Sequence, residues 1–159
     1  KADMLLFNVK AMEGRRTYYN TDVHRVHSWN SGRFPAYSIA VKRERLKQSG
    51  VTFSLLFGGG AKYSSGEDNL FLHDCLKRGL HLYADDAGIG REILRESTWF
   101  RGYTEKYFFD RGVLYAYLYG PMAHVMALRY LLTKKKKVCG EIPLSRAFRL
   151  MRDGIREGR

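Results

Sequence analysis

The amino-acid sequence predicts an α/β fold, with a small mixed sheet and its helices over residues 1–103 and a helical, basic extension over residues 104–159. Three observations lead to this prediction. Short apolar, β-prone runs alternate with turn residues in the first half of the chain, one clearly helical segment lies near residue 70, and helical periodicity is nearly continuous after residue 104. With 159 residues, 45% hydrophobic and 28% charged, the chain is long enough to bury a core.

Four segments of the N-terminal part have the apolar or β-branched composition of strands. They are Met4–Val9, Thr17–Asn20, Tyr37–Val41 and Val51–Phe57. Between the last two, Lys42–Gln48 has the composition of a short helix that ends at Gly50. The glycines Gly58–Gly60 end the fourth segment, because glycine permits positive φ and close backbone approach.

The next helix is predicted from the spacing of apolar residues. Leu70, Phe71, Cys75 and Leu76 recur at helical intervals, and Gly79 is a natural residue after a helix C-terminus. We expect Leu80–Tyr83 to form a short strand and Asp85–Asp86 to form a turn after it. The segment Ala87–Glu96 has the composition of either a strand or a loop.

The C-terminal extension is predicted to be helical. Thr104–Lys134 is apolar on nearly all sides, and Gly120–Pro121 divides it into two helices. Val113–Leu132 approaches the length of a membrane span. Its interior Gly120, Pro121, His124 and Arg129 favour a helical hairpin over a lipid-exposed span. Pro143–Glu157 has the pattern of a final amphipathic helix.

The chain is basic, and its charge is uneven. The formal net charge is +12, and residues 129–159 hold ten Lys/Arg against three Asp/Glu. Such a basic C-terminal region can bind nucleic acid, an anionic membrane leaflet or a phosphorylated ligand, or it can be a solvated helix face. The cluster Lys134–Lys137 directly follows a hairpin rich in tyrosine. Tyrosine combines an apolar ring with a polar hydroxyl, so this composition suits an interface with one edge exposed to water. These tyrosines are Tyr115, Tyr117, Tyr119 and Tyr130.

Cysteine and histidine spacing predicts no metal site. Cys75 and Cys139 have neither metal-type spacing nor a partner pattern, as expected in a reducing compartment. The five histidines lack zinc spacing; His24 and His27 could share a metal, but loop histidines are usually solvated. Only a short apolar run follows Lys1, so we expect no signal peptide.

The run Ser64-Ser65-Gly66-Glu67-Asp68 carries the chemistry that the sequence suggests. Two adjacent carboxylates follow a small, flexible step and open a predicted helix. A general base needs this kind of setting, a fixed carboxylate beside a loop that admits a substrate. The alternative is structural: acids favour the positive end of a helix dipole, and Ser65 with Asp68 has the spacing of a loose capping box.

The order of motifs around this pair points to a known family. Phe57-Gly58-Gly59-Gly60-Ala61-Lys62-Tyr63 comes before it, and Ser97-Thr98-Trp99-Phe100 comes after. Over residues 2–120 the chain resembles the acceptor half of a family 2, GT-A type glycosyltransferase, the group that includes bacterial cell-surface polysaccharide synthases. Gly66–Leu72 is the most specific part of the resemblance, and Ala2–Val9 resembles the strand that follows the metal-binding Asp-x-Asp turn.

The resemblance implies roles for individual residues. Asp68 matches the catalytic base of an inverting transfer, and Glu67 matches a neighbouring acid that orients the site. Gly59 and Gly60 would let an acceptor approach the backbone. Trp99 and Phe100 would offer flat faces to a sugar ring, with core packing as the alternative. Arg101 and Lys106 would neutralise the leaving diphosphate, with solvent exposure as the alternative.

The family pattern also has an N-terminal nucleotide-binding half with an Asp-x-Asp metal motif, which would lie upstream of Asp3. We therefore expect a truncated portion that does not turn over a sugar nucleotide alone and that holds no cofactor or metal itself. The intact enzyme is expected to use Mg or Mn with a nucleotide-sugar donor and a glycan or lipid-linked acceptor. Cytoplasmic localisation, peripheral at the inner face of the membrane, follows from the same reasoning.

Two other functions are compatible with the sequence. One is a basic, non-catalytic binding module for an anionic membrane, through Lys134–Lys137, or for nucleic acid. No helix-turn-helix, RNP-type or zinc pattern occurs, so nucleic acid is not favoured. The other is a protein-interaction domain that has kept a transferase-like half-fold. Homo-oligomerisation is compatible with all three functions.

Overall fold

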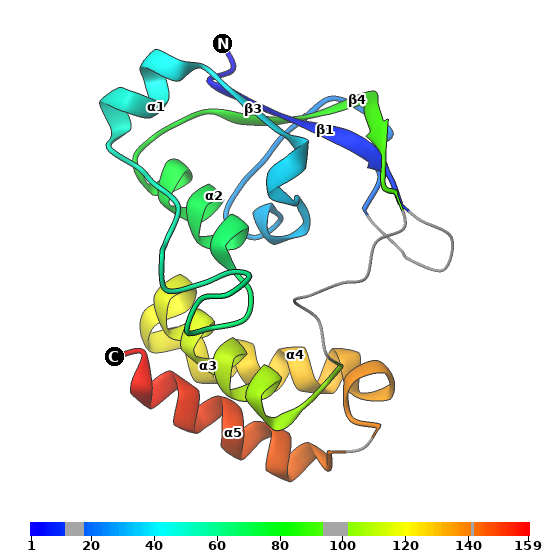
Figure 1. The fold of residues 1–159 in the computed structure, drawn as a ribbon, viewed down its shortest axis with the longest axis vertical. Coiled ribbons are helices and arrows are strands. Elements are labelled where there is room, and N and C mark those ends of the chain that lie inside the picture. The colour runs from blue at the N-terminus through cyan, green and yellow to red at the C-terminus, as the bar shows by residue number, and fades with distance from the viewer. Residues whose placement is uncertain (12–17, 94–101, 141) are drawn as a thin grey trace. The chain divides into compact units, whose positions relative to one another are not determined.

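The computed structural model describes the chain except residues 12–17, 94–101 and 141 (Figure 1). The chain forms two compact units. The first, which we call the sheet unit, comprises Lys1–Ser54 and Asp68–Glu96; the second, the helical unit, comprises Leu55–Glu67 and Ser97–Arg159. This division differs from the linear one into residues 1–103 and 104–159, because the Gly-rich segment is grouped with the C-terminal helices.

The sheet unit is built on a mixed sheet, so the predicted α/β class is confirmed. Among the described residues, four strands pair in the order β2-β4-β1-β3 (Figure 1). Strand β1 (Met4–Lys10) runs parallel to β4 (Leu82–Arg91) and antiparallel to β3 (Ile39–Val41). The short β2 (His24–Arg25) pairs antiparallel with the other side of β4.

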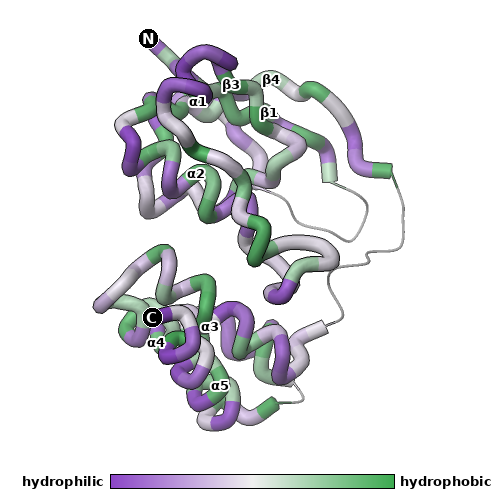
Figure 2. Tube along the Cα trace, turned by 60° about the vertical axis from the view of Figure 1, so that its left-hand side comes forward, coloured by the Kyte–Doolittle hydropathy of each residue, from purple (hydrophilic) through white to green (hydrophobic). Residues whose placement is uncertain are grey.

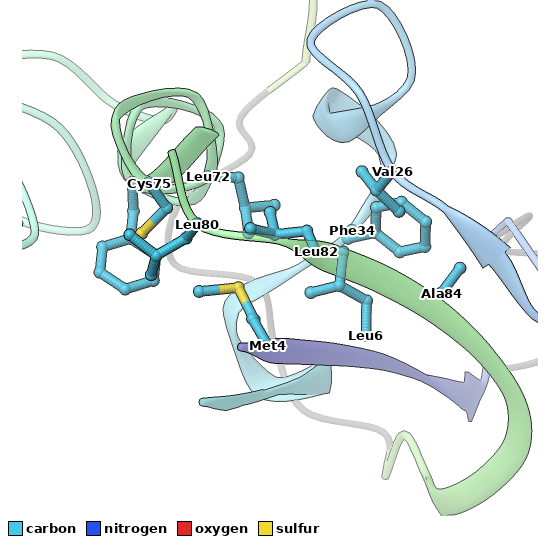
Figure 3. Packing of buried hydrophobic residues seen from close by; sticks show 10 residues of the cluster. Met4, Leu6, Val26, Phe34, Leu72, Cys75, Leu80, Leu82 and Ala84 are labelled. Carbon is cyan, nitrogen blue, oxygen red and sulfur yellow. The ribbon is translucent and has the colours of Figure 1, made fainter. Parts of the chain in front are cut away.

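Helix α2 (Glu67–Lys77) packs on this sheet through large apolar side chains. Leu72 and Cys75 from the helix lie in one cluster with residues of the strands (Figure 3). The strand residues of this cluster are Met4, Leu6, Leu82 and Ala84. The helical spacing of the α2 residues and the apolar composition of Met4–Val9 are the sequence signals that predicted these two elements.

A buried pair of asparagines joins β1 to β4 where the pairing of the two strands changes register. Asn8 Nδ2 donates to the carbonyl oxygens of Asn20 and Asp86, both at 2.9 Å. Asn20 Nδ2 donates to the carbonyl oxygens of Leu6, at 3.3 Å, and Asp85, at 3.0 Å. These side chains therefore provide acceptors on both strands with a hydrogen bond next to the register shift.

Several strand predictions were wrong. Residues 18–20 are not in a strand, and Tyr37–Ser38 belong to a 3₁₀ turn (Ala36–Ser38), so that β3 contains only the end of the predicted segment. Val51–Phe57 forms no strand; Phe57 alone makes an isolated bridge, with Tyr63. Asp85–Asp86 is not a turn but lies inside β4, which begins at Leu82 and not at Leu80.

The helix predictions of the N-terminal part are confirmed. Helix α1 spans Arg43–Ser49, and Gly50 ends it in the left-handed region with a φ of 68°. Helix α2 ends at Lys77, with Gly79 at a φ of 80°. Glycine adopts this backbone conformation without steric cost, which is why it marks helix ends in a sequence.

The helical unit contains the predicted hairpin and final helix. Helix α3 (Glu105–Tyr119) is capped by Thr104, whose hydroxyl accepts the Tyr107 N–H at 3.3 Å. A 3₁₀ turn (Gly120–Met122) leads into α4 (Ala123–Val138), and α5 (Leu144–Glu157) follows. In Figure 2 the alternation of hydrophobic and hydrophilic residues along α5 is visible as green and purple bands. No helix in the described ranges has both the length and the hydropathy needed to cross a membrane.

Two glycines let α3 and α5 touch at the backbone. A Cβ atom on Gly112 of α3 would lie 2.1 Å from the Met151 carbonyl oxygen of α5. A Cβ atom on Gly154 of α5 would lie 2.0 Å from the Phe109 carbonyl oxygen of α3. Both distances are far inside van der Waals contact, so no other residue fits at either position without moving a helix.

Of the four tyrosines predicted for the hairpin face, Tyr115 is buried, Tyr119 and Tyr130 are half-buried, and Tyr117 is exposed. Tyr115 is 7% exposed, and Tyr107 and Tyr130 share a hydrogen bond of 2.6 Å between their hydroxyls. The guanidinium of Arg111 lies 4.4 Å from the ring centroid of Tyr130 and donates to the Tyr107 hydroxyl at 3.0 Å. Burial raises the pKa of both Tyr107 and Tyr130, so both remain protonated donors at neutral pH.

Candidate active site

The site begins where α2 begins, at the Glu67–Asp68 pair. Gly66 precedes the helix with a φ of 121°, and its N–H donates to Glu67 Oε2 at 3.0 Å. The Glu67 side chain therefore satisfies an amide at the helix start, whereas the structural alternative from the sequence was a capping box of Ser65 with Asp68. Ser65 lies two residues before the first helical residue and so is not at the capping position.

The packing around position 66 explains why the residue before the acidic pair is a glycine. A Cβ atom at Gly66 would lie 2.7 Å from both methyl carbons of Leu114 in α3. The positive φ disfavours any other residue as well. The Ser-Ser-Gly step is thus fixed in conformation and packed against α3.

The Gly-rich loop contacts Glu67 through Gly58. Gly58 is buried at a φ of 119°, and a Cβ atom there would lie 3.1 Å from the Glu67 carboxyl carbon. The N–H of Gly58 donates to the Tyr63 carbonyl at 2.9 Å, which closes the loop. Gly59 and Gly60, the predicted acceptor-binding glycines, lie at its exposed tip. Their open position suits the approach of a ligand, and their predicted role remains a prediction.

A buried carboxylate in α3 holds the Gly-rich segment. Asp110 is only 3% exposed, and its Oδ2 accepts the Ser64 N–H at 2.9 Å. Lys106 Nζ donates to both Asp110 carboxylate oxygens, at 3.0 and 2.8 Å, and to the Lys62 carbonyl at 2.9 Å. We did not single out Asp110 from the sequence, although an acid inside an apolar helical run is a signal of a buried partner.

This network bears on Lys106, which we predicted to bind a diphosphate. An ammonium has three N–H donors, and the contacts with Asp110 and Lys62 occupy them. The geometry favours a role for Lys106 in holding the Gly-rich loop. The same loop is tied to α5 at its other end, where Lys62 Nζ donates to Glu157 Oε1 at 2.9 Å and holds the pKa of Glu157 below its usual range.

Asp68 occupies a different setting from Glu67. Its side chain is half-buried in the first turn of α2. Asp68 Oδ1 accepts the backbone N–H of Asn69 at 2.7 Å and the Asn69 side-chain amide Nδ2 at 2.9 Å. These two bonds fix the plane of the carboxylate, and a carboxylate offers roughly four lone-pair sites.

Asn69 is in turn held by a distant segment of the sheet unit. A Cβ atom on Gly32 would lie 2.7 Å from Asn69 Oδ1, so the amide sits directly on the Gly32 backbone. The backbone next to Gly32 turns through a short 3₁₀ segment (Ser31–Arg33). Asn69 and Gly32 are far apart along the chain, so the sequence did not reveal this proximity.

Three predicted residues lie outside the described part of the chain. These are Trp99, Phe100 and Arg101, whose expected contacts with a sugar ring and a diphosphate remain predictions. Across the described residues, no group of three or more His, Cys, Asp or Glu side chains could hold a metal ion. His27 stacks on Trp29, with ring centroids 4.4 Å apart. Both cysteines are free thiols.

Three cavities are defined by described residues. In the sheet unit, one of about 420 Å³ is lined by residues of Arg25–Trp29 and the C-terminal half of α2, and one of about 480 Å³ adjoins Gly50–Thr52. In the helical unit, one of about 440 Å³ adjoins Lys106 and Asp110. Neither Glu67 nor Asp68 lines any of these three.

Comparison with family models, curated proteins and solved structures found no match to this chain. The candidate site therefore depends on its geometry and on the resemblance of its motifs.

Proposed function

We propose that this chain forms the acceptor-binding, catalytic-base portion of an inverting glycosyltransferase with a GT-A type fold. The enzyme would transfer a sugar from a nucleotide-diphospho-sugar to a glycan or lipid-linked acceptor during synthesis of a cell-surface polysaccharide. The observation that carries the proposal is Asp68, a half-buried carboxylate in the first turn of α2 whose plane is fixed by Asn69. The parallel pairing of β1 with β4, which directly follows α2, supports the GT-A assignment.

The proposed chemistry is a single displacement. The acceptor hydroxyl oxygen forms a bond to the anomeric carbon while the bond from that carbon to the diphosphate oxygen breaks. Asp68 takes the hydroxyl proton, and the nucleoside diphosphate leaves with the electron pair. A base in this role needs an ionised carboxylate at hydrogen-bond distance from the acceptor, and a helix N-terminus favours the ionised form.

Glu67 has a supporting role in this proposal. Its carboxylate accepts the Gly66 N–H and lies against Gly58, so it connects the helix start to the Gly-rich loop. Glutamine has a side chain of the same length as glutamate and keeps one oxygen that can accept the Gly66 N–H. Glu67→Gln is therefore expected to reduce transfer far less than removal of the Asp68 charge.

The donor and its metal would be bound elsewhere in the polypeptide. In the family pattern, a nucleotide-binding half with an Asp-x-Asp motif precedes the strand that β1 resembles, and its carboxylates hold Mg or Mn. Such a metal would neutralise charge on the diphosphate. Arg101 remains the candidate in this chain for a direct diphosphate contact, and the enzyme would work in the cytoplasm at the inner membrane face, where these donors occur.

The experiment that tests the proposed class is product analysis with the complete reading frame that contains residues 1–159. The polypeptide is incubated with a panel of nucleotide-diphospho-sugars, Mg or Mn, and glycan and lipid-linked acceptors. We expect acceptor-dependent release of nucleoside diphosphate and a product of inverted anomeric configuration by NMR. Retained configuration, or release of nucleotide that is independent of every acceptor, would exclude an inverting transferase. The 159-residue chain alone is expected to be inactive.

A non-catalytic binding module remains the second candidate function. The net charge of +12 favours it, and the lysines Lys134–Lys137 are fully accessible. Binding to DNA or RNA that weakens steeply with salt and is lost when these lysines are neutralised would favour this candidate over the enzyme.

A further inference from the structure

Helix α4 presents an apolar stripe to solvent. Met122, just before the helix, and three residues within it are exposed at helical spacing. The exposed fractions are 56% for Met122, 55% for Val125, 44% for Leu128 and 57% for Leu132. The opposite face of α4 is already buried in the helical unit, through Ala123, Ala127 and Leu131. The stripe is therefore a second apolar face that has no function in the core.

The charged residues within α4 all have one sign. Residues 111–140 contain no Asp or Glu. Arg129 lies on the exposed side of α4, and the last full turn of the helix consists of Lys134–Lys137, all exposed. An exposed helix face that combines aliphatic side chains with lysines, and that lacks acids, has the composition of a helix lying in a membrane interface.

The structure corrects the part of the surface that we expected to be responsible. The sequence suggested that tyrosines of the hairpin form the water-exposed edge of an interface. Tyr115 is buried, however, and Tyr107 and Tyr130 pack around Arg111 inside the helical unit. Tyr117 of α3 stays exposed, whereas the exposed apolar side chains of α4 itself are all aliphatic.

We propose that α4 docks the chain on an anionic membrane surface, with Leu128 and Leu132 in the interfacial region and Lys134–Lys137 among the headgroups. Charge complementarity decides between occupants. A second copy of α4 offers no acidic residue to pair with these lysines, whereas an anionic leaflet attracts each lysine near its surface. A nucleic acid would engage the lysines but gains nothing from an aliphatic stripe. This inference is independent of the proposed sugar transfer.

The test is vesicle flotation with the full chain, which needs no knowledge of an enzymatic substrate. Vesicles of phosphatidylcholine alone are compared with vesicles that contain about one-third phosphatidylglycerol, a fraction that gives a strongly negative surface. We expect binding to the anionic vesicles at least about tenfold tighter than to the neutral ones. Equal binding to both, or to neither, would overturn the proposal.

Paired variants separate the two parts of the surface. Leu128→Ser with Leu132→Ser removes the stripe, and Lys135→Gln with Lys136→Gln halves the lysine cluster; each pair is expected to weaken binding at least about tenfold. Leu55→Ser is the matched control, because Leu55 is 94% exposed in the helical unit but lies outside α4, and its binding should be unchanged. Circular dichroism verifies that each variant is folded, as expected for exposed positions.

Two other outcomes would each contradict membrane docking in a defined way. Binding to a DNA or RNA duplex that the lysine variant loses and the serine variant keeps would assign the face to nucleic acid. Self-association in analytical ultracentrifugation that the serine variant abolishes, without any binding to vesicles, would assign it to a second copy of the chain.

Discussion

In the sheet unit, α2 meets the strands through side chains, whereas in the helical unit α3 and α5 meet at their backbones. Leu72 and Cys75 fill the space between helix and sheet, and such contacts adjust to small changes in volume. Gly112 and Gly154 leave no such space, because each lies against a carbonyl oxygen of the facing helix. Similar substitutions should therefore have very different consequences for stability in the two units.

The largest expected effect is that of Gly112→Ala in the helical unit. The new methyl group would lie 2.1 Å from the Met151 carbonyl oxygen, so α3 and α5 must separate. We expect a loss of at least about 3 kcal/mol in the free energy of unfolding, at the upper end of overpacking costs. Urea unfolding followed by circular dichroism measures this loss.

Gly140→Ala is the matched control for this substitution. Gly140 lies in the same unit, with nothing within 4 Å of an added Cβ and no positive φ. Its unfolding free energy should change by less than about 0.5 kcal/mol. If the two variants were equally stable, close backbone contact between α3 and α5 would be wrong.

A second substitution tests how the Gly-rich segment is held in the helical unit. Asp110→Ala leaves the Ser64 N–H and the Lys106 ammonium without their shared acceptor. We expect a loss of about 2 kcal/mol in the free energy of unfolding, the cost of breaking a buried charged hydrogen-bond network. Hydrogen exchange at the Ser64 amide should accelerate as well.

Asp153→Ala serves as its control. Asp153 is half-exposed on α5 and pairs with Arg152 at 3.5 Å and Arg156 at 3.9 Å. A surface pair of this kind contributes under about 1 kcal/mol. Destabilisation by Asp153→Ala equal to that of Asp110→Ala would show that burial does not distinguish the two acids.

The helices were predictable because their signals are local. Gly50 and Gly79 mark the ends of α1 and α2, and Gly120–Pro121 marks the break between α3 and α4. The strands were less predictable, since a strand needs a partner that can lie anywhere in the sequence. Asp85 and Asp86 have turn composition, yet they lie inside β4 at its register shift against β1, where their carbonyls accept from the side chains of Asn20 and Asn8.

The acidic pair and the Gly-rich loop of the candidate site were visible in the sequence, but the contacts that hold them were not. Asp68 stands out in the sequence as one of two adjacent acids at a helix start. The Asp68 carboxylate is bonded by Asn69, and Asn69 lies next to Gly32, which is far away in the sequence. No local sequence pattern predicts this arrangement. Lys106 was assigned from its charge alone, because its partners Asp110 and the Lys62 carbonyl become visible only in the fold.

One cysteine in each unit allows the two interiors to be compared in the same sample. Cys75 is buried in the sheet unit, and burial raises the pKa of its thiol to about 11. At pH 8 this thiol is protonated, so it should react with a thiol reagent at least about tenfold more slowly than the partly exposed Cys139. Mass spectrometry of the labelled protein identifies the site.

The pH dependence of this reaction provides an internal check. Because the folded-state pKa is raised, the reactivity of Cys75 should increase as the pH rises from 9 towards 11. Gly112→Ala should accelerate labelling of Cys139 more than that of Cys75, if the two units open separately. Labelling of Cys75 as fast as Cys139 at pH 8 would mean that the core beneath α2 is not closed.

The smallest expected effect on stability is that of Gly32→Ala in the sheet unit. The added methyl group would lie 2.7 Å from Asn69 Oδ1, the end of a side chain that can turn away. We expect the unfolding free energy to change by less than about 1 kcal/mol. Sugar transfer should fall roughly fivefold, because the Asp68 carboxylate loses its fixed orientation.

Gly90→Ala is the control for this variant, since nothing lies within 4 Å of an added Cβ on that glycine and its φ is not positive. It should leave both stability and transfer unchanged. Transfer by Gly32→Ala at the wild-type rate would argue that Asn69 does not position Asp68.

Asp68→Asn tests whether Asp68 is the catalytic base. The rate of sugar transfer is measured in the polypeptide that carries the donor-binding half. Asparagine keeps the shape of the side chain but cannot take a proton at neutral pH. We predict a fall in kcat of at least about 100-fold with an unchanged Kd for the nucleotide sugar, while Asp74→Asn, half-exposed further along α2, keeps full activity. Transfer by Asp68→Asn within tenfold of the wild-type rate would contradict the assignment of Asp68 as the catalytic base.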